Sequence, residues 1–211
     1  MQALPAGPGA VGIEIRRDLG TYSWPDGMVL PSVTHILGAV DSRIGQYASD
    51  VHLARGRIVH KATALLDGWG DGSGLDWSTL DPAFHGYVHA WARFTRESGF
   101  KPLRVERSVR SVRYGFCGTP DRVGWFPQKR GDVLMLVDLK TSQSVEAWWA
   151  LQTAAYAVAD SETFGQKIAV RQSVILRPNG RYDLPPSWTS PSDWPLFLSF
   201  LNVFRYLARK G

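Results

Sequence analysis

The pattern of apolar and polar positions near the start of the chain predicts a small hairpin followed by a helix. A Pro-Asp-Gly sequence at residues 25–27 separates two short apolar stretches and favours a tight turn. Ser32 or Thr34 then offers a side-chain oxygen where a helix beginning near His35 needs an N-terminal cap. This part of the chain is therefore expected to form a hairpin and a helical turn.

Two longer segments show the apolar spacing of amphipathic helices. Within residues 44–66 apolar side chains recur at helical intervals, and Gly68 is the expected end of this helix. A second helix is expected at residues 82–97, because its large apolar residues share one side. These residues are Phe84, Val88, Trp91 and Phe94. The Gly-rich, polar residues 68–81 between the helices are interpreted as a flexible connection.

The second half of the chain changes to the two-residue period of β-strands. Residues 103–109 alternate apolar and polar side chains, which predicts a strand. Residues 115–126 and 132–141 are joined by the turn-forming sequence Pro-Gln-Lys-Arg-Gly-Asp, so an antiparallel hairpin is expected. The residues just before Asp138 form a continuous apolar run, which predicts a strand in the interior of a sheet.

Three further segments give the expected fold class. Residues 145–159 are rich in helix formers, and residues 167–178 have the pattern of a strand. Residues 192–209 predict a closing helix with Ser192 or Asp193 near its cap. This order of elements predicts an α/β fold, in which a central mixed sheet is flanked by helices.

Length and composition favour one domain over residues 1–211. The chain has 211 residues, 44% of them hydrophobic, which is enough for one sizeable core. We expect an N-terminal hairpin and helices in residues 1–100, a catalytic core at about 101–180, and the closing helix. No apolar run is long enough to cross a membrane, and the start of the chain lacks the pattern of an export signal. A soluble, cytoplasmic protein is expected.

The chain is basic, with a net charge of +5 and a pI near 9.5. A basic surface attracts polyanions, so nucleic acid is a natural partner, although a solvated surface explains the charge equally well. Nine tryptophans and seven tyrosines are either core residues or rings on which exposed bases stack. The single cysteine, Cys117, excludes an internal disulfide and a cysteine-ligated zinc or iron–sulfur site, and is interpreted as a buried apolar residue.

Two aspartates and a lysine lie on the strands of the expected hairpin. Carboxylates from Asp121 and Asp138 that converge at the strand ends repel each other unless a cation lies between them, and Mg²⁺ prefers such hard oxygen ligands. Lys140 lies on the same strand face as Asp138, where it can orient or deprotonate an attacking water or neutralise charge on phosphorus. This set indicates a hydrolytic phosphodiester site. The alternative is a surface Asp–Lys pair beside an ordinary turn.

These residues also carry a resemblance to a known family. Pro120-Asp121 followed by Asp138-Leu139-Lys140 resembles the signature of the PD-(D/E)XK nuclease superfamily. The residues that match motifs of its RecB-like branch are Gln152 and Tyr156 (Gln-x-x-x-Tyr), His60 (Gly-x-x-x-His) and Glu106. The segment 30–37 is similar to segments of phage exonucleases and of the mitochondrial genome maintenance exonuclease. The resemblance covers about residues 29–160 and implies a restriction-endonuclease-like core.

The resemblance implies a role for each matched position. The implied metal ligands are Asp121, Asp138, the backbone carbonyl of Leu139, and His60. Glu106 holds a water on the metal or a second ion, and Lys140 acts on the attacking water. Two alternatives stay open: His60 as an ordinary helix histidine, and Glu106 as a strand-face glutamate paired with Arg104 or Arg110.

Four residues beside the metal ligands are expected to contact DNA. Gln152 and Tyr156 are four apart, so they share a helix face from which they can reach a phosphate or the DNA backbone. Their alternative is a core tyrosine and a glutamine that caps a strand end. Arg122 and Thr141 adjoin the metal ligands and are expected to hold flanking phosphates, with a solvated arginine and a strand-end threonine as the alternative.

The expected function is that of a Mg²⁺- or Mn²⁺-dependent DNA exonuclease. The resemblance implies action on single strands or DNA ends in phage-type recombination, replication or repair, with a single-strand-binding or annealing protein as a further candidate partner. Some members of the branch carry a four-cysteine iron–sulfur cluster, which one cysteine excludes here. The alternatives are a structure- or sequence-specific endonuclease and, in another class, a catalytically inactive DNA-binding module.

Overall fold

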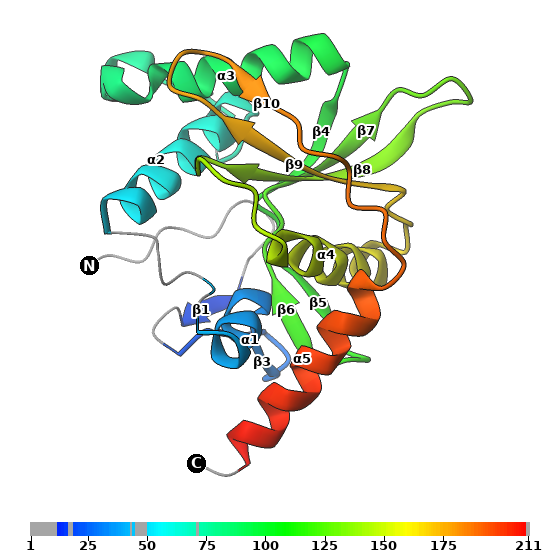
Figure 1. The fold of residues 1–211 in the computed structure, drawn as a ribbon. Helices are drawn as coiled ribbons and strands as arrows, with labels where there is room; N and C mark the ends of the chain where they lie inside the picture. Colours follow the sequence, from blue (N-terminus) through cyan, green and yellow to red (C-terminus); the bar gives the residue numbers. More distant parts are fainter. Residues whose placement is uncertain (1–11, 17–18, 43, 45–49, 71, 210–211) are drawn as a thin grey trace.

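The computed structural model describes residues 12–16, 19–42, 44, 50–70 and 72–209. A central five-stranded sheet has the order β10-β9-β8-β7-β4 (Figure 1). Its strands are β4 (Lys101–Val105), β7 (Arg122–Phe126), β8 (Val133–Lys140), β9 (Val170–Leu176) and β10 (Tyr182–Asp183). The β8–β9 pair is parallel and the other pairs are antiparallel, so the sheet is mixed, as predicted.

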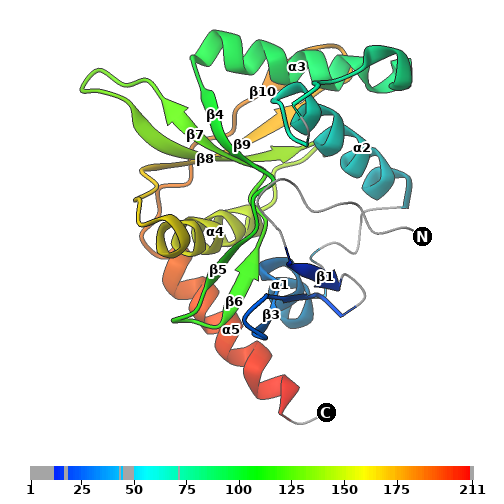
Figure 2. The same ribbon diagram turned by 180° about the vertical axis from the view of Figure 1, so that it is seen from behind.

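Helices cover both faces of this sheet. The helices α2 (Asp50–Leu66) and α3 (Pro82–Ser98) lie on one face, and α4 (Trp148–Phe164) lies on the other (Figures 1 and 2). Alternate residues of β8 enter two apolar clusters: Leu134 and Leu136 pack with α4, whereas Val137 packs with α3. A strand covered on both sides must be apolar throughout, which explains the continuous apolar run. The predicted interior strand is thus confirmed.

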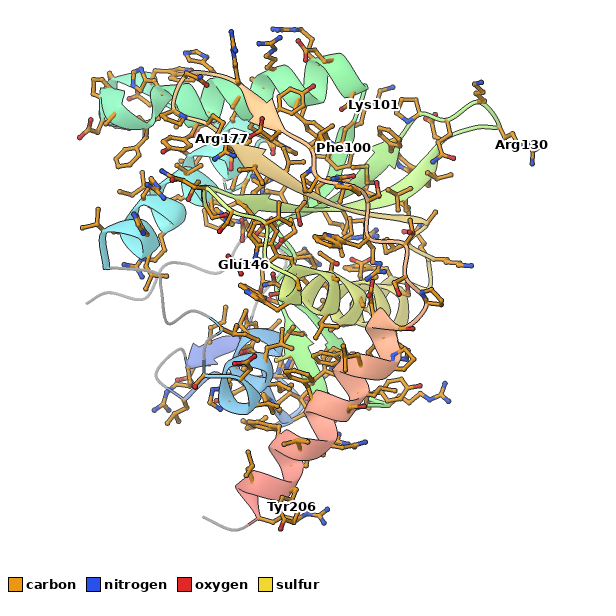
Figure 3. All side chains as sticks on the ribbon, viewed as in Figure 1. Phe100, Lys101, Arg130, Glu146, Arg177 and Tyr206 are labelled. Carbon is orange, nitrogen blue, oxygen red and sulfur yellow. The ribbon has the colours of Figure 1, made fainter. Side chains whose placement is uncertain are left out.

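The outer side of α4 packs against a second group of elements. These are α1 (Val33–Val40), α5 (Asp193–Ala208), and the paired strands β5 (Val109–Ser111) and β6 (Phe116–Gly118). A three-stranded sheet of β1 (Glu14–Arg16), β2 (Thr21–Ser23) and β3 (Val29–Pro31) adjoins this group where β3 contacts β6. Ile36, Phe116 and Phe197 join α4 residues in one apolar cluster. Arg130 marks the tip of the β7–β8 hairpin, which projects beyond the helices, and Tyr206 lies near the far end of α5 (Figure 3).

Most of the predicted elements and caps are confirmed. The β2–β3 hairpin turns through the Pro-Asp-Gly sequence, and Ser32 caps α1 by accepting a hydrogen bond from the His35 amide at 3.2 Å. Gly68 closes α2 with a φ of 80°, and the second helix spans Pro82–Ser98. Of the helix predicted from residue 44, the described part begins at Asp50, and residues 45–49 lie outside the described residues. Cys117 is buried.

Two predicted strands are each broken in the middle. The strand predicted at 103–109 divides at Glu106 into β4 and β5, and the strand predicted at 115–126 divides at 119–121 into β6 and β7. Each half pairs in a different sheet, β4 with β7 and β5 with β6. Glu106 has a φ of 46°, which interrupts strand geometry, and Pro120 has no amide proton for a ladder. Both breaks lie at the candidate site.

Smaller differences concern element ends and the connection between α2 and α3. The fourth helix begins at Trp148 rather than residue 145 and continues to Phe164, where Gly165 closes it with a φ of 68°. The connection predicted to be wholly irregular contains a short 3₁₀ helix, η1 (Trp77–Thr79), which Asp76 caps. The two-residue strand β10 was not predicted, because such a short strand has no period to detect.

Gly118 is expected to be intolerant of a side chain. A Cβ atom there would lie 2.3 Å from Cε1 of Tyr156, a ring buried in the core. Gly118→Ala should lower the free energy of unfolding by about 1–3 kcal/mol in a urea titration. Gly38→Ala in α1 is the matched control, because the nearest atom lies 3.9 Å away and alanine favours the helix. Equal unfolding midpoints for the two variants would refute this packing argument.

Candidate metal centre

Asp121 and Asp138 face each other across the centre of the sheet. The register of β7 and β8 pairs Arg122 with Val137, so one further step places Asp121 opposite Asp138, on the face covered by α4. Both residues are buried, with 8% and 2% of their surface exposed. Carboxylates that are this deeply buried need cationic partners or a metal ion to remain ionised. The predicted meeting of these two acids is therefore what the register produces.

His60 of α2 bridges the backbone and one of the acids. Its Nδ1 lies 3.1 Å from Oδ1 of Asp121, and its Nε2 lies 3.1 Å from the carbonyl oxygen of Leu139. Both contacts are to acceptors, so the imidazolium form satisfies them best. Burial lowers the pKa of His60, but the Asp121 carboxylate outweighs burial and, with Glu106, raises that pKa to about 9. His60 thus contacts Oδ1 of Asp121 and the Leu139 carbonyl oxygen, two atoms of the residues that the motif implies as metal ligands.

Asp121 is fixed by contacts at both of its carboxylate oxygens. While Oδ1 faces His60, Oδ2 accepts a hydrogen bond of 2.7 Å from the Leu139 amide. Burial opposes ionisation, but the charge of His60 and these hydrogen bonds leave the pKa of Asp121 below its usual value. This carboxylate is therefore ionised and aligned with β8, next to the Leu139 carbonyl.

Glu106 approaches from the end of β4. Its positive φ turns the chain there, and its amide donates to the carbonyl of Asp121 at 2.9 Å. Among the described residues, ligand atoms of His60, Glu106 and Asp121 lie within 4.8 Å of one another. Burial and the nearby Asp121 charge raise the pKa of Glu106 to about 7. Such a left-handed conformation in a non-glycine residue costs free energy and is commonly found at functional sites.

Asp138 lies beside this group and is paired with Lys140. The Lys140 ammonium is 2.8 Å from Oδ2 of Asp138 and donates to Oε1 of Gln152 at 3.0 Å. The rings of Trp148 and Trp149 flank the ammonium at 5.3 and 5.2 Å. Burial raises the pKa of Asp138, Lys140 opposes that change and Asp121 adds to it. No donor among the described residues contacts Oδ1 of Asp138, which is left available to a ligand.

Gln152 contacts Lys140 directly, and Tyr156 contacts Gln152. Gln152 and Tyr156 are each only 6% exposed. Gln152 accepts from Lys140 through its oxygen and donates to the Tyr156 hydroxyl at 3.3 Å through its nitrogen. The hydrogen bond from Lys140 supports a role for Gln152 in positioning the lysine, and direct contact with DNA stays a prediction. The predicted shared helix face is the reason that the two residues meet.

The expectation that Arg122 binds a flanking phosphate is wrong. Its side chain is fully buried and donates to Asp67 at 2.6 Å, to Thr63 at 3.1 Å and to the carbonyl of Asp121 at 2.6 Å. A further contact of 3.3 Å reaches Oε1 of Glu106. Arg122 therefore links two strands and α2 within the core, and each of its three side-chain nitrogens already donates a hydrogen bond.

Thr141 and the arginines near Glu106 have partners other than those expected from the sequence. Thr141 is half-buried, and its carbonyl accepts a hydrogen bond of 3.0 Å from Arg55 of α2. Its hydroxyl lies 3.5 Å from Nε of the same arginine. The alternative partners for Glu106 are wrong, because Arg104 pairs with Asp160 and Arg110 pairs with Asp26.

Asp67 and Thr63 belong to the site but were not predicted. Asp67 accepts from Arg122 and from the Trp91 indole, with burial raising its pKa and Arg122 opposing that change. Together with His60 they are spaced at three and seven residues along one side of α2. This polar spacing is the signal in the sequence that identifies the two residues.

The donor set fits a hard divalent cation. Asp121, Asp138 and Glu106 supply carboxylate oxygens, Leu139 supplies a carbonyl, and His60 supplies an imidazole. Mg²⁺ and Mn²⁺ accept such oxygen-rich sites, whereas the one cysteine offers nothing to softer metals. The raised pKa values of Asp138 and Glu106 indicate negative charges that a cation would stabilise. These acidic residues can hold a metal ion.

Metal affinity is expected to rise with pH. A metal ion at Asp121 and His60 must displace the proton held between them, and the pKa of His60 is about 9. Apparent affinity for Mn²⁺ should therefore increase about tenfold per pH unit from pH 7 to pH 9 and then level off. Calorimetric titrations at several pH values measure this slope.

His60→Gln is the control for this pH dependence, because it removes the titrating group. The slope between pH 7 and pH 9 should then become shallow, while Glu106, with its pKa near 7, still affects binding at lower pH. A wild-type affinity that does not change between pH 7 and pH 9 would show that no proton leaves His60 on binding.

Comparison with known proteins adds a distant likeness in fold. The structure is similar to the crystal structure of an alkaline exonuclease from Laribacter hongkongensis, with 15% sequence identity and a TM-score of 0.34. The match covers 71% of this chain and 91% of that one. No family model matches the sequence, and no curated protein does.

No helix among the described residues is both long and apolar enough to span a membrane.

Proposed function

We propose that this chain is a divalent-metal-dependent deoxyribonuclease. The observation that supports it most is the opposition of Asp121 and Asp138 on the central strands, with Lys140 against Asp138 at 2.8 Å. Two buried acids, a lysine and an adjacent backbone carbonyl make up the hydrolytic set expected from the sequence. His60 and Glu106 extend it with further ligand atoms.

Each residue in this set has a defined task. Asp121 and Asp138, with the Leu139 carbonyl and His60, hold the metal ion, which would be Mg²⁺ or Mn²⁺. Once bound, the ion would supply charge neutralisation at the scissile phosphate and activation of water. Lys140 presents its ammonium where it can orient the water or stabilise charge on phosphorus, and Gln152 keeps it there. The buried Arg122 guanidinium fixes Glu106 and the backbone carbonyl of Asp121 by hydrogen bonds.

We further propose that the enzyme acts on single strands or DNA ends as an exonuclease. The support is the order and spacing of the nuclease motifs within one domain, residues 1–211. The basic chain, at a net charge of +5, suits a polyanionic substrate without base recognition. A phage-type role in recombination, replication or repair in the cytoplasm follows from the same resemblance.

Linear and circular single-stranded DNA distinguish the candidate activities. With Mg²⁺ or Mn²⁺, linear DNA labelled at either end should be degraded, the circle should persist, and a chelator should stop the reaction. Degradation of the circle would favour an endonuclease instead. Binding of DNA without any metal-dependent cleavage would leave only the inactive DNA-binding module.

A further inference from the structure

The segment that connects β10 to α5, residues 184–191, runs beside β9 near the candidate site. Gln172 donates to the Pro185 carbonyl at 2.7 Å and accepts from the Ser187 hydroxyl at 2.6 Å. The amide of Trp188 donates to the Arg171 carbonyl at 3.0 Å. These contacts fix the segment along the start of β9 (Figure 1). None of its residues belongs to a nuclease motif identified in the sequence.

Trp188 reaches Asp138 through one intervening side chain. Its indole nitrogen donates to Oγ of Ser173 at 3.0 Å, and Ser173 donates to Oδ2 of Asp138 at 3.4 Å. The parallel register places Ser173 directly beside Asp138. An indole N–H is only a donor, so the serine hydroxyl must direct its own proton elsewhere. The acceptor in that direction is the Asp138 carboxylate.

The donors around Asp138 gather on one of its two oxygens. Oδ2 receives both the Ser173 hydroxyl and the Lys140 ammonium, while Oδ1 has no donor among the described residues. Outer hydrogen bonds of this kind hold a metal-binding carboxylate in one orientation. Ser173 itself is fully buried, so water does not compete for this contact.

We propose that Trp188 and Ser173 are positioning residues for the metal site, acting together to keep Oδ1 of Asp138 turned toward the ion. This inference rests on the proposed function, because it assigns Asp138 as a metal ligand. It adds the connecting segment, distant in sequence from every motif residue, to the parts of the chain that determine metal affinity.

The test is a calorimetric titration of metal-free protein with Mn²⁺. Ser173→Ala should weaken Mn²⁺ binding about tenfold, and Trp188→Phe, which keeps a ring but removes the N–H, should weaken it several-fold. Because Trp188 acts through Ser173, the double variant should bind no more weakly than Ser173→Ala alone. Ser173→Thr retains the hydroxyl and should restore most of the affinity.

Trp69→Phe is the matched control, because the buried Trp69 indole nitrogen has no hydrogen-bond partner among the described residues. It should leave Mn²⁺ affinity unchanged. Unchanged affinity in Trp188→Phe, or additive losses in the double variant, would overturn the relay from Trp188 through Ser173 while the metal site stands. If the wild type itself binds no Mn²⁺, both the relay and the proposed function fail. Thermal unfolding of each variant identifies loss of fold, and Trp188→Phe decides alone if Ser173→Ala unfolds.

Discussion

Asp121→Asn is expected to reduce metal-dependent DNA cleavage by about a hundred- to a thousandfold. Asparagine has nearly the same shape and can still accept from the Leu139 amide, so the fold should persist. It removes the charge that faces His60 and stands opposite Asp138, and with it the strongest attraction for a cation. Single-turnover cleavage of end-labelled DNA in Mg²⁺ measures the loss.

Asp132→Asn is the control for this variant. Asp132 is exposed in the β7–β8 hairpin, far along the strands from the site, so its charge has no role in metal binding. Cleavage by Asp132→Asn should match that of the wild type. A metal-dependent rate in Asp121→Asn within a few-fold of the wild type would mean that Asp121 does not bind the ion.

Arg122→Met is expected to destabilise the protein by about 3–5 kcal/mol. The substitution leaves Asp67 and Glu106 without the buried guanidinium that lies between them, and it removes the bonds to Thr63 and to the Asp121 carbonyl. Partly buried carboxylates without a cationic partner are costly, because little water reaches them to replace it. The free energy of unfolding from urea titration gives the magnitude.

Two comparisons make the Arg122 result specific. Arg93→Met breaks an exposed pair with Glu97 on α3 and should cost less than about 1 kcal/mol. Adding Asp67→Asn to Arg122→Met should recover part of the loss, since one unpaired charge is removed. A cost for Arg122→Met as small as that for Arg93→Met would show that the buried network contributes little.

The fold was largely predictable because its strongest signals are local. The apolar run before Asp138 identified the interior strand, and helical spacing identified α2 and α3. The break at Glu106 was not predictable, because the two-residue period continues through it. Pro120, which has no amide proton for a ladder, was a local signal for the second break. The chain turns at Glu106 because β4 pairs with β7 whereas β5 pairs with β6. Strand pairing depends on the whole fold and cannot be read from one segment.

The site was predictable where residue type and strand register suffice. Asp121, Asp138 and Lys140 follow from one hairpin, and the motif resemblance supplied His60 and Glu106. The positions of Arg122 and Ser173 were not predictable, because each depends on residues from distant segments. In the sequence, Arg122 next to Asp121 has the pattern of an exposed, solvated arginine. In the fold, Asp67 and Trp91 contact its guanidinium inside the protein. Ser173 meets Asp138 through the parallel β8–β9 register and meets Trp188 through the segment after β10, so its contacts come from distant parts of the chain.

The most direct test of the central claim is anomalous diffraction from crystals grown with Mn²⁺. We expect one strong peak in contact with a carboxylate oxygen of Asp121, Oδ1 of Asp138 and the Leu139 carbonyl, with the Lys140 ammonium beside it. Mn²⁺ bound only elsewhere, or Asp121 and Asp138 left without a shared ion at saturating Mn²⁺, would contradict it.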